Sequence, residues 1–350
     1  MSKGLQKKIL IGVVCIAVVA AAVLIALIKI PDLYITFMQH TGMVTGKVNS
    51  FEPKGETGVQ EVNGVELWSN IKYADEYPNS FLDIYLCDPQ GEGLHPTMFY
   101  LHGGGLCWGD KMEGDPTGIK PNPADMSYLQ TVCASGYNVV SVNYALAPQY
   151  RYPIPLWQVD QAIRFLIENA DAYGLDMEHI VFAGGSAGAQ LSGLYIDIQI
   201  NEDYARQMNM EQVLVNGEII GVVLNCPLLD PVGCQTLKTG EFWTDLMYED
   251  LGKVNFRSDE AILQEANVLL HMNENWPTTY LTDGNAATFF DQSFELKDRL
   301  DQYGVYCEFN YYEEPELWHG YDGDLTSPYA QDNLAKTLVF LENLKATIGE

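Results

Sequence analysis

The chain has 350 residues, of which 47% are hydrophobic and 19% are charged. This composition excludes a disordered chain and a disulfide-stapled mini-domain, and the length suits one large domain or two small ones. The net charge of −28 comes from 19 basic and 47 acidic residues. An acidic surface repels phosphate, so we expect no nucleic-acid partner.

Residues 1–30 form a separate segment that holds four lysines and no acidic residue. From Ile9 to Ile28 the chain carries no charge, and a helix of this length spans about 30 Å of hydrocarbon. We therefore expect a transmembrane signal anchor, with a cleaved signal peptide or a buried core helix as alternatives. Three of the lysines precede the span, which places the following domain outside the cytoplasm, at the cell surface or in the periplasm. If the segment is cleaved, the protein is secreted.

Residues 31–64 predict a linker and an N-terminal flap, and residues 65–350 predict a single catalytic-type α/β domain. In this part, eight segments are typical of strands. They are Val65–Tyr73, Phe81–Cys87, Thr97–Leu101, Tyr137–Asn143, His179–Ala183, Ile219–Asn225, Thr278–Thr282 and Val305–Tyr311. Helices are expected over Ala124–Ala134, Leu156–Tyr173, 187–200, 289–303 and Asp332–Leu344. Alternating strands and helices predict a mostly parallel eight-stranded sheet with helices on both faces.

One long stretch interrupts this alternation. Residues 231–276 separate the sixth and seventh expected strands and are rich in apolar side chains. Because ligands bind at the carboxyl ends of parallel strands, an insertion here is positioned to form a lid or cap. A packed surface excursion without a role in substrate binding is the alternative.

Cysteine spacing indicates neither a metal centre nor a redox motif. Six cysteines follow the apolar span, and an even number in an exported domain permits disulfides whose pairing the spacing does not determine. No C-x-x-C pair occurs, and several of the cysteines lie in strand-like runs where buried free thiols are expected. We expect no metal and no cofactor.

The sequence Gly184-Gly185-Ser186-Ala187-Gly188 matches G-x-S-x-G, and its context strengthens the match. It follows an expected strand and precedes an expected helix, which is the setting that exposes a serine hydroxyl in a sharp turn. The alternative is an ordinary glycine-rich turn. We predict that Ser186 is a nucleophile.

A second glycine-rich loop, His102-Gly103-Gly104-Gly105, follows the third expected strand. An oxyanion needs two main-chain donors, and we expect them from Gly103, Gly104 and Ala187, the residue after the nucleophile. His102 precedes the serine, and in this type of site the base follows it, so we expect His102 to hold the loop by hydrogen bonds.

Two histidines follow Ser186, namely His271 and His319. His319 lies in a polar loop after the last expected strand and is the predicted base, because that loop can reach a strand end. Asp283 directly follows the seventh expected strand and is the predicted acid, with Asp291 as the alternative. The acid must hold the imidazole in one orientation, which a strand end does better than the first turn of a helix.

Together these motifs make the chain resemble α/β-hydrolase fold carboxylesterases of the hormone-sensitive-lipase-like and feruloyl/acetyl esterase-like groups. The resemblance covers residues 65–348 and rests on motifs that occur in the same order. They are His102–Gly105, Asn143–Pro148, Gly184–Gly188, Asp283 and His319–Tyr321. The resemblance implies an α/β-hydrolase fold and a Ser-His-Asp carboxylesterase without a metal or cofactor.

The chain departs from this pattern at two positions. Gly185 stands where many lipase-like members have Asp, which is closer to the feruloyl/acetyl esterase-like members. Asp283 directly abuts its strand and no proline follows it, whereas the acid of this family usually lies a few residues further on.

The predicted reaction is hydrolysis of short-chain or carbohydrate-linked acyl esters through an acyl-enzyme. We expect Trp108, Tyr144, Trp318 and Tyr321 to line the substrate pocket, with ordinary packing as the alternative. An amidase, arylformamidase-like or peptidase activity on the same triad, and a non-catalytic membrane-anchored binding protein, are the other hypotheses. The sequence does not predict the oligomeric state.

Overall fold

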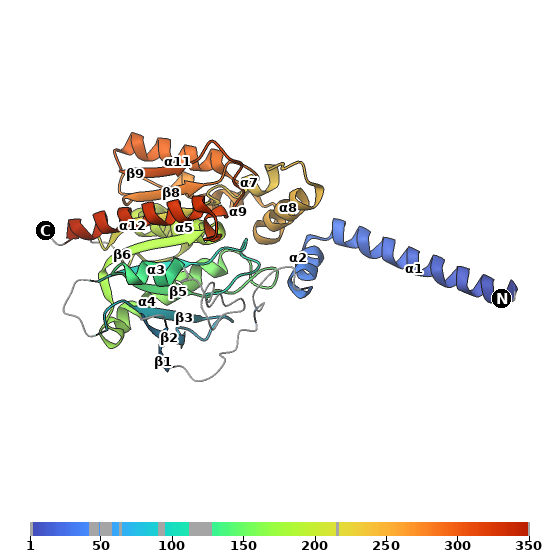
Figure 1. Cartoon of the computed structure of the whole chain (residues 1–350), viewed down its shortest axis with the longest axis horizontal. Helices are drawn as coiled ribbons and strands as arrows, with labels where there is room; N and C mark the ends of the chain where they lie inside the picture. Colours follow the sequence, from blue (N-terminus) through green and yellow to red (C-terminus); the bar gives the residue numbers. More distant parts are fainter. Residues whose placement is uncertain are drawn as a thin grey trace.

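The computed structural model describes residues 3–41, 49, 58–62, 65–89, 95–111, 128–214 and 217–348. Within these ranges nine strands form one sheet, in the order β1-β2-β3-β5-β4-β6-β7-β8-β9 (Figure 1). The strands are β1 (Gly58–Val62), β2 (Val65–Lys72), β3 (Phe81–Leu86), β4 (Pro96–Leu101), β5 (Asn138–Val142), β6 (Asp176–Gly185), β7 (Ile219–Asn225), β8 (Thr279–Asp283) and β9 (Cys307–Tyr311).

The sheet is antiparallel at one edge and parallel over the rest. β1, β2, β3 and β5 pair antiparallel in succession, whereas β5, β4, β6, β7, β8 and β9 are parallel neighbours. All eight predicted strands are present. The expectation of eight was one short, because β1 falls in the predicted flap, and its GVQEV sequence carries too few apolar residues to indicate a strand.

Helices cover both faces of the sheet, as the alternation predicted. The described helices of this domain are α3 (Tyr128–Ala134), α4 (Ile154–Tyr173), α5 (Ala187–Ile200), α6 (Glu202–Met208), α11 (Phe290–Tyr303), the short 3₁₀ helix η1 (Tyr321–Gly323) and α12 (Pro328–Ile348). Residues 124–127, the start of one predicted helix, lie outside the described residues.

Alternate strand residues point to opposite faces and into separate apolar cores. In β6, Phe182 packs with α4 and α5 on one face, whereas Val181 packs with α3 and α12 on the other. This two-residue period is the property that fixes the register of the sheet and brings the carboxyl ends of β4, β6, β7 and β8 to one edge. All seven cysteines lie in described residues and are free thiols.

The N-terminal helix α1 (Lys3–Lys29) projects away from the domain (Figure 1). Its segment Leu5–Lys29 is long and apolar enough to cross a membrane, a property that membrane anchors and signal sequences share. The next segment is not the expected linker. Pro31–His40 forms helix α2, which packs against α8 (Phe242–Phe256). Its Tyr34, Ile35 and Met38 are buried there.

Residues 231–276 consist mainly of helices rather than an open loop. They hold α7 (Val232–Thr236), α8, α9 (Glu260–Glu265) and α10 (Val268–His271). Tyr248 and Leu251 of α8 share an apolar cluster with α2 and with Cys107, which follows the His102–Gly105 loop. This cluster therefore joins the N-terminal helices to the edge of the sheet where the predicted site residues lie.

Candidate active site

Ser186 lies in a sharp turn between β6 and α5, at the carboxyl end of a central strand. Its backbone has φ 55° and ψ −117°, which L residues rarely adopt. A Cβ on Gly184 would lie 2.5 Å from the carbonyl carbon of Gly188, and a Cβ on Gly188 would overlap the carbonyl oxygen of Leu101. Both positions therefore require glycine, and Ser186 borders an open cavity.

The loop after β9 brings His319 next to Ser186. The His319 Nε2 lies 2.8 Å from the Ser186 Oγ. Burial lowers the pKa of His319 to about 4, so the ring is neutral at neutral pH. A neutral imidazole at this distance can accept the serine proton.

Asp283 ends β8 and is fully buried, but no direct hydrogen bond joins it to His319. Thr288 lies between them. Its Oγ1 is 2.9 Å from the His319 Nδ1 and donates to the Asp283 Oδ1 at 2.6 Å. When the imidazole accepts from Ser186, its Nδ1–H can donate to Thr288, so the hydroxyl relays the interaction between ring and carboxylate.

The Asp283 carboxylate accepts two further hydrogen bonds. Ser293 donates to Oδ2 at 2.7 Å, and the Gly284 N–H donates to Oδ1 at 2.8 Å. These bonds favour the ionised form, but burial outweighs them and raises the pKa of Asp283 to about 7. The carboxylate is therefore held in one position, and it takes up a proton as the pH falls through neutrality.

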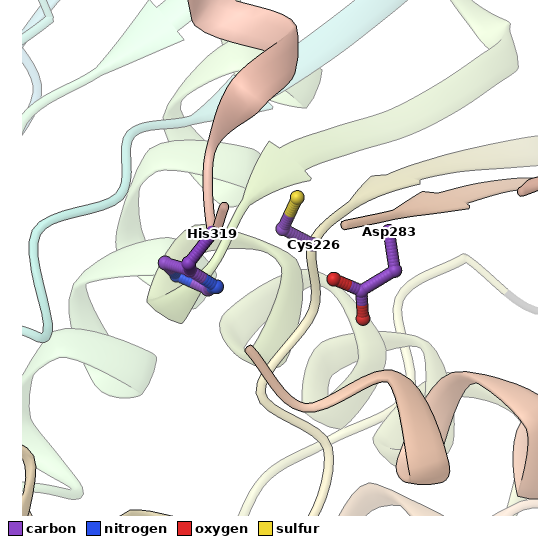
Figure 2. A group of neighbouring side chains, drawn as sticks. All are labelled: Cys226, Asp283 and His319. Carbon is purple, nitrogen blue, oxygen red and sulfur yellow. The ribbon is translucent and has the colours of Figure 1, made fainter. Parts of the chain in front are cut away.

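Cys226, Asp283 and His319 lie close enough to form a candidate metal site, with one ligand atom of each within 4.8 Å of the others (Figure 2). Their existing bonds fit this role poorly. The Nε2 of His319 faces Ser186, and the Asp283 oxygens accept from hydroxyls and an N–H. Burial raises the pKa of Cys226, which favours the thiol over the metal-binding thiolate. The arrangement fits proton transfer better than metal binding.

The predicted oxyanion donors Gly103, Gly104 and Ala187 all border the cavity beside Ser186. Ala187 is the first residue of α5, so its N–H has no acceptor within the helix. Gly104 has φ 99°, and its carbonyl accepts from the N–H groups of Cys107 and Trp108 at 2.9 and 3.1 Å. The glycine loop is thus a fixed turn that passes beside the serine.

His102 supports this loop from behind, as predicted. It is buried, its Nδ1 lies 2.8 Å from the Gly103 carbonyl, and its ring stacks on Tyr144 at 4.1 Å. The Tyr144 hydroxyl donates to the His102 carbonyl at 2.5 Å. Tyr144 is therefore a buried support for the loop rather than part of the cavity wall.

The cavity beside Ser186 has a volume of about 280 Å³. Of the four aromatic residues expected to line it, the structure brings only Trp108 there. Trp318 is 45% exposed, with its indole N–H on Glu316, and Tyr321 is buried with its hydroxyl 2.6 Å from the Thr282 hydroxyl. Their neighbour His319 reaches the cavity, but the loop directs these two side chains elsewhere.

The alternative base and acid lie away from this arrangement. His271 stacks on Tyr204 at 3.8 Å and bonds the Gln264 carbonyl at 3.0 Å. Asp291 lies in the first turn of α11 and is not in the cluster with His319. The sequence order of the motifs therefore selected the two residues that the fold brings to Ser186.

Sequence reasoning missed Thr288 and Ser293, which hold Asp283 in place. Both hydroxyl residues follow the acid within ten positions, one in the loop and one on α11, but nothing in their spacing marks them as partners. It also missed Asn225 and Asp322, which border the cavity from the ends of β7 and η1.

Comparison with known proteins places this geometry in a family context. The family model BD-FAE matches residues 82–300. The acetyl esterases of Salmonella choleraesuis (strain SC-B67) and Salmonella typhi are each 27% identical over 221 residues, which is 62% of this chain and 62% of each relative. The matched part is thus less than two thirds of the relatives' length.

Solved structures resemble the whole domain. Esterase B from Lactobacillus rhamnosis (HN001) has a TM-score of 0.70 and 18% identity, covering 93% of this chain and 96% of that one. A bacterial heroin esterase has a TM-score of 0.62 and 21% identity, covering 89% of this chain and 91% of that one. These likenesses confirm the predicted α/β-hydrolase fold.

Proposed function

The chain belongs to the BD-FAE family, and from this premise we propose that it is a serine carboxylesterase. Its substrates are short-chain or carbohydrate-linked acyl esters, a class suggested by the acetyl esterases among its relatives. The observation that carries the proposal is the 2.8 Å contact between the Ser186 Oγ and the His319 Nε2. A cavity of about 280 Å³ beside it has room for a small acyl group.

In the proposed reaction Ser186 attacks the ester carbonyl while His319 takes its proton. The imidazolium that forms donates through Nδ1 to Thr288, whose hydroxyl donates to Asp283. The carboxylate stabilises the positive ring without taking its proton. His319 then delivers the proton from Nε2 to the leaving alcohol, and water activated by the same ring releases the acid from Ser186.

The N–H groups of Gly103, Gly104 and Ala187 receive the negative charge that develops on the carbonyl oxygen. Because they are fixed before the reaction, they need no reorganisation in the transition state. Removing one such donor typically costs about 3 kcal/mol of barrier. The support that His102 and Tyr144 give to the loop therefore serves the reaction indirectly.

We also assign two parts of the chain outside the triad. Residues 231–276 act as a cap, since Met247, Tyr248 and Leu251 of α8 border the cavity. Helix α1 anchors the protein in a membrane, and its three leading lysines keep the N-terminus in the cytoplasm and the catalytic domain outside.

The test is hydrolysis of p-nitrophenyl acetate, butyrate and octanoate by the full chain in detergent. We expect turnover of the short esters, and a loss of at least about 10⁴-fold in kcat for Ser186→Ala and for His319→Ala. Ser258→Ala, at an exposed site, is the matched control and should keep full activity. A folded parent that cleaves no ester, or a Ser186→Ala variant as active as the parent, contradicts the proposal.

A further inference from the structure

The cavity beside Ser186 differs in polarity from one end to the other. Most of its wall is apolar and comes from α8 and neighbouring loops, with side chains of Trp108, Leu228, Met247, Tyr248, Leu251 and Phe289. A polar group, Asn225, Cys226 and Asp322, forms another part of the wall. The Cys226 thiol joins the group, since it lies 3.5 Å from the Asp322 Oδ1. This polar group has no part in the reaction steps proposed above.

Asn225 brings an unused acceptor to within reach of the nucleophile. It ends β7, and its main-chain carbonyl accepts from the Ser186 N–H at 2.8 Å, which fixes it beside the catalytic turn. Its side chain is only 5% exposed, and within the described part of the chain its Oδ1 has no hydrogen-bond partner. A buried amide oxygen without a donor is unfavourable, and a donor on a bound ligand would satisfy it.

Asp322 adds a second acceptor with a negative charge. Among the described residues it forms no ion pair, and the residues that line the cavity include no Lys or Arg. Burial raises the pKa of its carboxyl, while hydrogen bonds involving Cys226 and Asn225 oppose the shift. Two acceptors without a local cation fit a ligand group that donates hydrogen bonds, and the chain's net charge of −28 favours a cationic one.

The position of this group indicates which part of an ester it meets. His319 must hand its proton to the leaving oxygen, so the alcohol part of the ester lies on the His319 side of the serine. Asp322 follows His319 by three residues in the same segment, and the Gly320 N–H between them donates to the Cys226 sulfur at 3.3 Å. The polar group therefore faces the alcohol and not the acyl chain.

We propose that Asn225 and Asp322 form a subsite for the leaving alcohol, and that it selects alcohols with a hydrogen-bond donor, above all an ammonium group, a few atoms from the ester oxygen. This subsite rests on the proposed esterase function. A hydroxyl satisfies the same acceptors without the gain from opposite charge, so polyol esters bind there less strongly than amino-alcohol esters.

The experiment compares acetates that have matched shapes. The protonated ester 2-(dimethylamino)ethyl acetate is compared with its neutral isostere 3-methylbutyl acetate, and 2,3-dihydroxypropyl acetate is compared with 2-methylbutyl acetate. For the wild type we expect kcat/KM to favour the ammonium ester by about tenfold and the diol ester by a smaller factor. Asp322→Asn should abolish the ammonium preference and keep the diol preference, because the amide still accepts from a hydroxyl.

p-Nitrophenyl acetate separates the two proposals. If it is hydrolysed but the wild type shows no ammonium preference, or Asp322→Asn retains that preference, the subsite is wrong and the esterase stands. If none of the esters is hydrolysed, both fall. Should Asp322→Asn fail to fold, inhibition of the wild type decides, since 2-(dimethylamino)ethanol should inhibit more strongly than 3-methylbutanol, and equal inhibition overturns the subsite.

Discussion

At the scale of single residues, the contact between acid and base passes through a hydroxyl. Thr288 bonds both the His319 Nδ1 and the Asp283 carboxylate, and Ser293 fixes the other carboxylate oxygen. A hydroxyl is both donor and acceptor, so it can receive the imidazolium proton's hydrogen bond while it donates to the carboxylate. Thr288 is therefore a positioning residue whose role is specific to its hydroxyl.

Thr288→Val, which keeps the shape and removes the hydroxyl, should lower kcat by about 100-fold with little change in KM, since the imidazolium loses its link to Asp283. Steady-state hydrolysis of p-nitrophenyl acetate measures both constants. Thr288→Ser keeps the hydroxyl and should restore most of the activity. Wild-type activity in Thr288→Val, or equal defects in the two variants, would show that Thr288 only fills space.

The pKa values give a direction for the dependence on pH. Burial raises the pKa of Asp283 to about 7 and lowers that of His319 to about 4, so on acidification the carboxylate takes up its proton first. A protonated Asp283 cannot stabilise the imidazolium, and kcat/KM should fall as the pH drops through about 7. In Asp283→Asn the remaining activity should be much lower and its decline should move to lower pH, because His319 alone titrates.

A pH–rate profile of each variant checks this expectation. Asp291→Asn is the matched control, since Asp291 lies on the adjacent helix outside the relay, and it should keep the wild-type profile. If Asp283→Asn declines at the same pH as the wild type, Asp283 does not set the acid side of the profile.

At the scale of elements, helix α2 holds the oxyanion loop. Gln39 on this helix donates from Nε2 to the Cys107 carbonyl at 2.6 Å and to the Ala147 carbonyl at 2.8 Å. Cys107 closes the turn that begins at Gly104. The segment that follows the apolar anchor is thus part of the catalytic domain.

Gln39→Ala should lower kcat/KM by about tenfold, because the turn beside Gly104 loses a buried bond that fixes it. His40→Ala, on the same helix but exposed and bonded only to the Thr36 carbonyl of its own helix, is the control and should be unaffected. The measurement is p-nitrophenyl acetate hydrolysis together with thermal unfolding. Equal activity of the two variants would mean that α2 does not support the loop.

The elements that the sequence predicted well are those with a strong apolar period. The parallel strands and α4 and α5 bury continuous or regularly spaced apolar side chains, and the glycines around Ser186 are required by close backbone contacts. Helix α2 and strand β1 are short, and their type is decided by packing on α8 and pairing with β2, which no local pattern encodes.

At the scale of the whole molecule, motif order predicted Ser186, Asp283 and His319 because the fold brings successive strand ends to one edge. What joins distant segments was not predictable. The buried pair of Lys111 and Asp83, 2.6 Å apart, links the segment after the glycine loop to β3, and Thr288 completes the relay. Such contacts depend on side-chain positions that only the packed molecule defines.

The most direct test of the account is covalent labelling of the full chain with a p-nitrophenyl alkylphosphonate, followed by intact-mass and peptide mass spectrometry. The account predicts one adduct per chain, located on Ser186, with activity lost in proportion to labelling and no adduct in Ser186→Ala. An adduct on another residue, or full esterase activity in a chain completely labelled at Ser186, would contradict it.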